Sequence, residues 1–225
     1  MCVIATAVDA TGAGRLGAAF AEASAPEEPS LQVAAHAGDL FDEIYRRGAP
    51  IESTLKTVSA SFVETTTSTL LKAPQVARGT LVARRPSDVR LQYSGADART
   101  VVISGNTLAV DWPRRGLRDR RDISGMMRRA QRFLTATSPA ELRKHFDIAA
   151  SVATDSPQTW TVIFTPRRKQ LREGVAAVRL WIDQQTLLLR AMRLEFPGGD
   201  TTLMEFADVR LNPPVDADAF VPASR

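Results

Sequence analysis

One hairpin stands out in the sequence: Thr80-Leu-Val-Ala-Arg-Arg-Pro-Ser-Asp-Val-Arg-Leu-Gln-Tyr93. Its second half alternates apolar Val89, Leu91 and Tyr93 with polar residues, which is typical of a strand with one buried face. Pro86 and the two residues after it suit a tight turn, because proline presets φ. The stretch therefore predicts a strand, a turn and a second strand in an antiparallel sheet.

Arg85 does not fit the alternation of the first strand. Leu81 and Ala83 occupy its apolar face, and the same spacing assigns Arg85 to that face. An inward guanidinium is costly unless it is paired or hydrogen-bonded. The hairpin thus predicts either a buried partner for Arg85 or a bulge after Ala83 that turns the side chain outward.

The charge of the chain is concentrated in one segment. The 225 residues carry a formal charge of +4 and are 44% apolar, enough for a sizeable core. Residues 114–132 hold eight arginines against two aspartates, an excess of six that leaves the rest of the chain at minus two. Such a run is most often a solvated face, and otherwise docks on anionic head groups or an acidic partner. Nucleic acid is not expected, because no aromatic residues interleave with the arginines.

The first 30 residues are predicted to be a flexible leader or linker. Ala23-Ser-Ala25 resembles a signal-peptidase site, but the basic region that opens a signal peptide is missing. A native signal peptide, a disordered leader and a mis-set start all stay open, as does acylation of Cys2 as the true N-terminus. The single cysteine excludes an internal disulfide.

Two helices are expected next. Residues 31–47 have an apolar stripe that ends at Gly48, and we assign 31–48 to an extra N-terminal helix. Ile51, Leu55, Val58 and Phe62 recur at helical spacing and predict a second helix from about residue 50 to 65. Residues 49–225 would then form the main domain.

The rest of the chain is mostly strand. The pattern predicts an exposed loop over 114–122, a helix over 123–134, a short helix after a capping box at Ser138 and a polar loop over 166–174. Short alternating segments bounded by turn residues predict strands over 99–104, 107–112, 159–165, 176–183, 187–196 and 201–211. The fold class is therefore α+β, mainly β, with a curved antiparallel sheet.

The order of these parts resembles the LolA family, the periplasmic carriers of bacterial lipoproteins. The resemblance spans about residues 50–222 and rests on Gly79-Thr-Leu-Val-Ala-Arg-Arg-Pro86, Val101-Val-Ile-Ser-Gly-Asn-Thr-Leu108 and Val215-Asp-Ala-Asp-Ala-Phe-Val-Pro222. It implies an open, incomplete antiparallel β-barrel with helices covering the mouth and acyl chains in the hollow. It also implies that Arg85 hydrogen-bonds the covering helices when the hollow is closed. Val89 and Leu91 replace aromatic residues of the family pattern, which puts pocket size and ligand preference in question.

The same resemblance implies a monomeric periplasmic carrier that receives acylated lipoproteins or lipids from a membrane donor and passes them to an acceptor. We expect no cofactor, no metal and no nucleic acid, and we expect no enzyme, because no nucleophile elbow or phosphate loop is present. His36 and His145 lack further metal ligands nearby, so structural roles are favoured. The predicted ligand-binding residues are Arg85, Leu81, Val89, Leu91, Tyr93, Leu108, Val110, Met126, Met127, Phe133, Trp160, Val162, Phe164, Val178, Leu180 and Ile182.

Two other functions stay open. The lipid-binding domain of RseB-type regulators has a similar fold, so the chain could sense lipid and contact a protein without transporting anything. The hollow could also be filled by its own side chains, as in a purely structural module. In that case Met126, Met127 and Phe133 would be ordinary core residues.

Overall fold

The fold is one antiparallel sheet of eleven strands, seen in a computed structural model that describes residues 37–125, 127–128 and 138–221. In chain order the elements are α1 (Ala37–Thr54), β1 (Thr57–Thr67), β2 (Gln75–Arg84), β3 (Asp88–Tyr93), β4 (Thr100–Ser104), β5 (Thr107–Trp112), the 3-10 helix η1 (Pro113–Arg115), β6 (Leu117–Asp122), α3 (Pro139–His145), β7 (Phe146–Ala153), β8 (Ser156–Pro166), α4 (Lys169–Arg172), β9 (Ala177–Asp183), β10 (Leu189–Glu195) and β11 (Thr201–Leu211).

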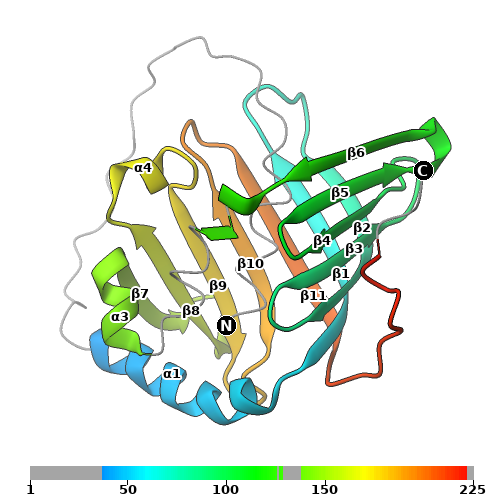
Figure 1. Ribbon diagram of the computed structural model, residues 1–225. Helices are drawn as coiled ribbons and strands as arrows, with labels where there is room; N and C mark the ends of the chain where they lie inside the picture. Colours follow the sequence, from blue (N-terminus) through cyan, green and yellow to red (C-terminus); the bar gives the residue numbers. More distant parts are fainter. Residues whose placement is uncertain (1–36, 126, 129–137, 222–225) are drawn as a thin grey trace.

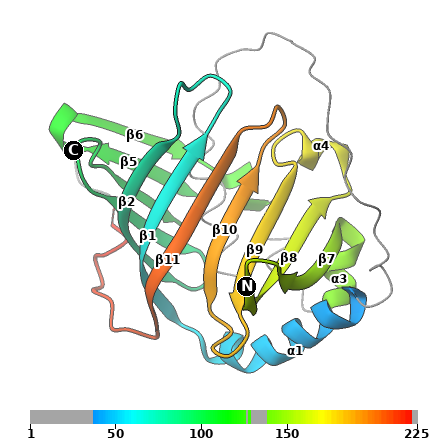
Figure 2. The same cartoon turned by 180° about the vertical axis from the view of Figure 1, so that it is seen from behind.

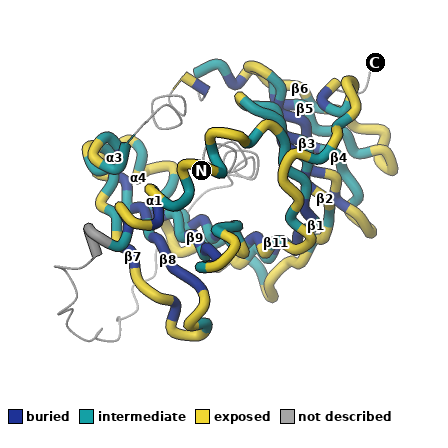
Figure 3. The backbone as a smooth tube through the Cα atoms, turned by 90° about the horizontal axis from the view of Figure 1, so that it is seen from below, coloured by how far each residue is buried: buried dark blue, intermediate teal, exposed yellow. Residues whose placement is uncertain are grey.

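The sheet curls strongly but does not close. Its strand order is β6-β5-β4-β3-β2-β1-β11-β10-β9-β8-β7, so β6 and β7 are two unpaired edges (Figure 1). Seen from behind, β2, β1, β11, β10, β9 and β8 form the continuous back wall (Figure 2). Seen from below, the backbone of the strands follows a curved path from β7 and β8 to β5 and β6, and α1 and α3 lie beside β7 and β8 (Figure 3). This confirms the open, incomplete antiparallel barrel that the family resemblance implied.

The β2–β3 hairpin forms as predicted. Leu81 pairs with Leu91 and Ala83 with Val89, and all four side chains are buried on the concave face. The turn occupies residues 85–87, and its Arg85–Pro86 peptide bond is cis. The predicted strands over 99–104, 107–112, 159–165, 176–183, 187–196 and 201–211 are also present, within a few residues of their expected ends.

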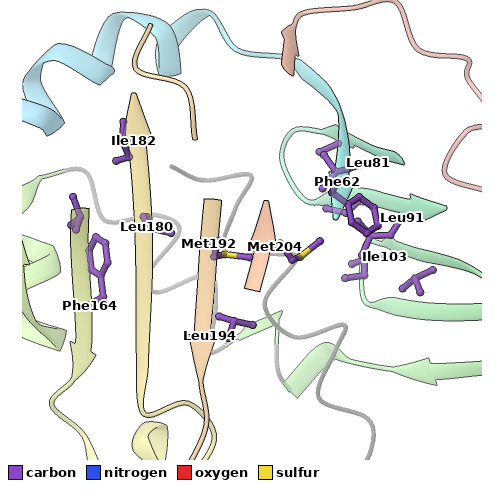
Figure 4. Close-up of a cluster of buried hydrophobic side chains, with 14 of the residues drawn as sticks. Phe62, Leu81, Leu91, Ile103, Phe164, Leu180, Ile182, Met192, Leu194 and Met204 are labelled. Carbon is purple, nitrogen blue, oxygen red and sulfur yellow. The ribbon is translucent and has the colours of Figure 1, made fainter. Parts of the chain in front are cut away.

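The core lies along the concave face of the sheet. Met192 on β10 and Met204 on β11 pair across the two strands and are each 1% exposed. They lie between the side chains of β8 and β9 and those of β1–β4 (Figure 4). Alternation on each strand assigns these residues to one face, and their burial supplies most of the stabilisation of the sheet.

The two predicted N-terminal helices are wrong in their boundaries. A single helix, α1, runs through both Gly48 and Pro50, and β1 begins at Thr57. The helix continues past Pro50 at the loss of one hydrogen bond, because residues before and after it, such as Ile44 and Ile51, turn toward the sheet. Beyond residue 56 the apolar spacing is that of a strand, with Ala60 and Phe62 on the buried face.

The predicted loop over 114–122 is also wrong, because most of it is strand. Pro113–Arg115 is a 3-10 turn, Gly116 has a left-handed φ of 60°, and β6 pairs with β5 from Thr107–Asp122 to Trp112–Leu117. Arginine and aspartate side chains gave no apolar period, but an edge strand needs only its backbone to pair and is commonly charged.

Three other segments were predicted with mixed results. Ser138 accepts a hydrogen bond from the backbone N–H of Glu141 at 3.2 Å and caps α3, as predicted. Strand β7 was missed, and the polar loop over 166–174 contains the short helix α4. Of the helix expected over 123–134, Met126 and residues 129–137 lie outside the described residues, and Met127 is buried.

The division of the chain into a leader, an extra helix and a main domain stays a prediction. Residues 1–36 lie outside the described residues, so the expected leader and the first part of the extra helix are among them. Within the described part of the chain, no helix has both the length and the apolarity needed to span a membrane.

Candidate functional site

An apolar cavity of about 160 Å³ lies between α1 and the concave face of the sheet. Its roof is the second half of α1, and its walls come from strands that are adjacent in the sheet but far apart in sequence. The lining is apolar apart from Tyr45 and Glu52, both on α1. The residues around it are Ile44, Tyr45, Gly48, Ile51, Glu52, Leu55, Val58, Ala60, Leu81, Leu180, Ile182, Leu187, Leu188, Leu189, Met192, Phe206, Val209 and Leu211.

Arg85 holds the C-terminal end of α1 against the sheet. Its Nη1 donates to the backbone oxygen of Glu52 at 2.7 Å, and its own N–H donates to the oxygen of Lys56 at 2.9 Å. The last carbonyls of a helix have no partner within the helix, and a cation there also interacts favourably with the helix dipole. The hydrogen-bond partner of the Arg85 guanidinium, which the strand alternation assigned to the apolar face, is therefore a backbone oxygen of the covering helix α1.

Asn212, just after β11, makes a second connection to the same helix end. Its Nδ2 donates to the oxygen of Thr54 at 3.2 Å, and its Oδ1 accepts from the N–H of Lys56 at 2.7 Å. Its φ of 55° is in the left-handed region, which asparagine tolerates better than most residues. Arg85 and Asn212 thus approach the end of α1 from two different strands, β2 and β11.

The middle of α1 is held by Arg47. Its Nη2 donates to the oxygen of Gln184 at 2.7 Å, and its guanidinium lies 4.8 Å from the ring centre of Trp160. Nearer the start of α1, Asp42 pairs with Arg143 of α3 at 2.7 Å. Polar contacts therefore occur along the helix, while its apolar side faces the cavity and the core.

The β9–β10 turn forms one wall of the cavity and is shaped by Asp183. One carboxylate oxygen, Oδ1, accepts from the N–H groups of Gln185 and Thr186, at 3.0 and 2.7 Å, and the other from Arg190. These bonds, led by the one from the Thr186 backbone, lower the pKa of Asp183 well below its ordinary value. The ionised carboxylate keeps the turn in the shape that presents Leu187 to the cavity.

A buried polar cluster lies at the other end of the concave face. The Tyr93 hydroxyl donates to Oε2 of Glu64 at 2.7 Å, and the Arg99 guanidinium lies 3.6 Å from the Tyr93 ring centre and 3.7 Å from Oε1 of Glu64. Glu64 is only 5% exposed. Burial, and after it the charge of Glu64, raises the pKa of Tyr93 far above its usual value.

The structure brings only part of the predicted site together around the cavity. Leu81, Leu180 and Ile182 line it, and Arg85 reaches its roof from the hairpin turn. Other predicted residues lie elsewhere in or against the core: Val89, Leu91, Tyr93, Leu108, Val110, Met127, Trp160, Val162, Phe164 and Val178. Met126 and Phe133 lie outside the described residues. Contact of any of these side chains with a ligand stays a prediction.

Sequence reasoning missed most of the lining. The apolar stripe of α1 was visible in the sequence, but nothing in it indicated which face of the sheet the helix covers. Leu187, Leu188 and Leu189 follow one another where the β9–β10 connection enters β10, and a run of three leucines assigns no face by periodicity. Phe206 and Val209 belong to β11, whose alternation the sequence showed without its position beside β1.

The cavity is apolar, and its polar groups lie at the margin. Among the described residues, no group of three or more His, Cys, Asp or Glu side chains is placed to hold a metal ion. The polar groups at its edge are used in hydrogen bonds to backbone atoms, as with Arg85 and Asn212. An apolar cavity with a few polar groups at its margin is the common form of a small-molecule binding site.

Solved structures with a similar fold come from several bacteria. The lipoprotein LppX of Mycobacterium tuberculosis matches with a TM-score of 0.51 at 15% identity, over 80% of this chain and 99% of that chain. An uncharacterized conserved protein from Thermus thermophilus matches with a TM-score of 0.51 at 8% identity, over 83% of this chain and 95% of that chain. The MucA/MucB complex of Pseudomonas aeruginosa matches with a TM-score of 0.42 at 13% identity, over 81% of this chain and 60% of that chain.

The family of the chain is identified by a match that extends over most of its sequence. Among curated proteins, no sequence matches this chain significantly. Residues 53–223 match the family model described as outer membrane lipoprotein carrier protein LolA, which covers most of the 225 residues. The chain therefore belongs to the LolA family.

Proposed function

We propose that this protein is a carrier that binds acyl chains of lipoproteins or lipids in the cavity beneath α1 and passes them on. The observation that supports this most directly is an apolar cavity whose roof is a helix held at its end by Arg85 and Asn212. Each acyl methylene that enters such a cavity contributes roughly 0.8 kcal/mol. A roof attached through side chains can move aside without unfolding the sheet.

Opening of the roof would exchange the Arg85–Glu52 hydrogen bond for contacts with water or with a ligand head group. A ligand shifts such an equilibrium only through its different affinity for the open and closed states. Acyl chains too long for about 160 Å³ would bind the open state alone. Arg85 would then favour the closed, empty state and so promote release.

The cavity itself is tested by a charge placed inside it. Ile51 lines the cavity, while Ser53, two residues further along α1, is exposed. We expect Ile51→Asp to weaken saturable binding of an apolar fluorescent probe at least about tenfold, because a carboxylate resists transfer into an apolar site. The matched variant Ser53→Asp should bind as the wild type does. Equal binding by both variants, or probe that a lipid does not displace, would contradict the proposal.

The role of Arg85 is tested separately by transfer kinetics. Arg85→Leu removes the bond to Glu52, so we expect faster opening and slower release of acylated cargo to acceptor vesicles, with capture changed less. Arg210→Leu, an exposed arginine on β11, is the matched control. Unchanged transfer would remove Arg85 from the mechanism while leaving binding in the cavity intact.

Periplasmic location and the exchange with a membrane donor and acceptor belong to this proposal and follow from the family. The alternative is a lipid-sensing regulator of the RseB type. Saturable lipid binding without transfer, together with capture of a membrane-anchored protein at low but not high salt, would favour that alternative.

A further inference from the structure

The end of the barrel opposite α1 is formed by turns that connect strands of the β1–β6 half of the sheet. Three turns, residues 68–74, 94–99 and 113–116, lie at this end, because alternate connections of an antiparallel meander turn at the same edge. Two contacts connect this region: the Ser94 N–H donates to the oxygen of Arg78 on β2 at 2.8 Å, and Arg115 of the 113–116 turn pairs with Asp97 of the 94–99 turn at 2.5 Å. We call residues 68–78, 94–99 and 111–118 the turn end.

The turn end exposes large apolar side chains. Leu70 is 75% exposed, Val76 is 57% exposed and Leu117 is 56% exposed. Leu70 projects from the β1–β2 loop, and Val76 and Leu117 stand at the ends of β2 and β6 that adjoin these turns. None of them belongs to the apolar core of the described residues.

The turn end is also positively charged. It holds six cations against Asp97 and Asp111, and Glu64 adds a third acid beside Arg99, so the excess is three positive charges. Lys72, Arg78 and Arg114 are exposed and form no ion pair with any described residue. By contrast, the turns at the opposite edge of the same strands, counted with their flanking residues as 84–88 and 104–107, carry Arg84, Arg85 and Asp88, an excess of one positive charge.

We infer that the turn end docks on the surface of an anionic lipid bilayer. Exposed apolar side chains on a loop and at strand ends, each within two residues of a lysine or arginine in the sequence, can enter the head-group layer while the cations meet lipid phosphates. This inference goes beyond the proposed function, since docking does not depend on what the cavity holds.

Docking by the turn end has a consequence for orientation. The roof helix α1 lies at the other end of the barrel, beside the 85–87 turn to which it is hydrogen-bonded (Figure 1). The cavity entrance would therefore face away from the bilayer, toward the aqueous phase. The docked protein would present α1 to a second protein rather than to the membrane surface.

The test is co-sedimentation of the full chain with vesicles of phosphatidylcholine alone or mixed in equal parts with phosphatidylglycerol. We expect partitioning onto the mixed vesicles only, lost at about 0.5 M salt, where charges are screened within a few ångströms. Arg78→Ser combined with Arg114→Ser should weaken partitioning about 30-fold, from the contribution of each basic residue at an anionic surface. Arg46→Ser combined with Arg210→Ser changes the net charge equally, away from the turn end, and should bind as the wild type does.

Orientation is read from an environment-sensitive dye on a single cysteine, in a Cys2→Ser background. A dye at Leu70→Cys should shift to shorter emission wavelength on mixed vesicles, and a dye at Ser53→Cys on α1 should not. Equal binding to neutral vesicles, equal loss in both double variants, or a shift at Ser53 alone would overturn the inference. Binding to a soluble polyglutamate peptide with no vesicle binding would also overturn it, because it would identify an acidic protein as the partner.

Discussion

The two ends of the concave face hold polar side chains in different ways. At the α1 end, Arg85 and Asn212 donate to backbone oxygens at a partly exposed margin. At the other end, Glu64, Tyr93 and Arg99 bond to one another around a carboxylate that is 5% exposed. Hydrogen bonds at a wet margin can be exchanged for bonds to water, whereas a buried carboxylate that loses its partners keeps its full desolvation cost.

This difference indicates which end can open. The α1 end contains the cavity, and its contacts to the sheet can be replaced one at a time. The Glu64 end is locked, since separating its members would leave a charge unsolvated. We therefore expect changes at the Glu64 end to affect stability most, and changes at the α1 end to affect opening.

The largest effect is expected at Gly79, which pairs with Tyr93 at the locked end. A Cβ there would lie 2.3 Å from the backbone oxygen of Gln92 and 2.7 Å from the Phe62 ring. Because backbone and ring must both move, Gly79→Ala should cost about 3 kcal/mol of unfolding free energy. Gly48→Ala, where a Cβ meets nothing within 4 Å, is the control. Equal unfolding midpoints in denaturant for the two variants would contradict the packing described for this end.

Tyr93→Phe should have the next largest effect. It removes the hydroxyl that donates to the buried carboxylate of Glu64, which should cost about 2 kcal/mol. In a Glu64→Gln background the same change should cost about half as much, because no charge then depends on it. A double-mutant cycle by chemical denaturation measures the difference, and additive effects would show that the two residues act independently.

Asn212→Ala should have a smaller effect, about 1 kcal/mol, because the helix end it holds is exposed to water. The same variant should take up an apolar probe faster, since one attachment of the roof is gone. Asn212→Gly keeps the left-handed φ and separates loss of the side chain from backbone strain. A stability loss as large as that of Tyr93→Phe would mean that the two ends are equally locked.

At neutral pH both tyrosines are protonated in the folded and the unfolded state, so the ionisation of Tyr45 and Tyr93 affects stability only in alkali. Burial raises the pKa of both above 10, so the folded protein binds their protons more tightly than the unfolded chain does. The stabilisation is complete below pH 10 and is lost as the pH rises past it. Tyrosinate absorbance should therefore appear together with loss of the fold. Early ionisation of Tyr93 in folded protein would show that the Glu64 end is open to water.

The structure was predicted most accurately from the sequence where the apolar alternation of a strand and the position of a turn required the same strand pairing. In the β2–β3 hairpin, alternation of Val89, Leu91 and Tyr93 and the turn at Pro86 both require the same register. It failed over residues 57–62, where the spacing of Val58 and Phe62 fits a helix and a strand equally. It failed again at β6, where pairing depends on the backbone and the side chains are charged.

The inward direction of Arg85 and the alternating faces of each strand were readable from the chain alone, because steric periodicity is a local property. The hydrogen-bond acceptor of Arg85, the backbone oxygen of Glu52, could not be predicted, because it reaches the guanidinium only when α1 crosses the end of the barrel. The cavity likewise exists only because residues from α1, β9 and β11 meet across long sequence separations. Local patterns determine which face of an element is apolar, but only the packing of distant elements decides whether two such faces close together or leave a space.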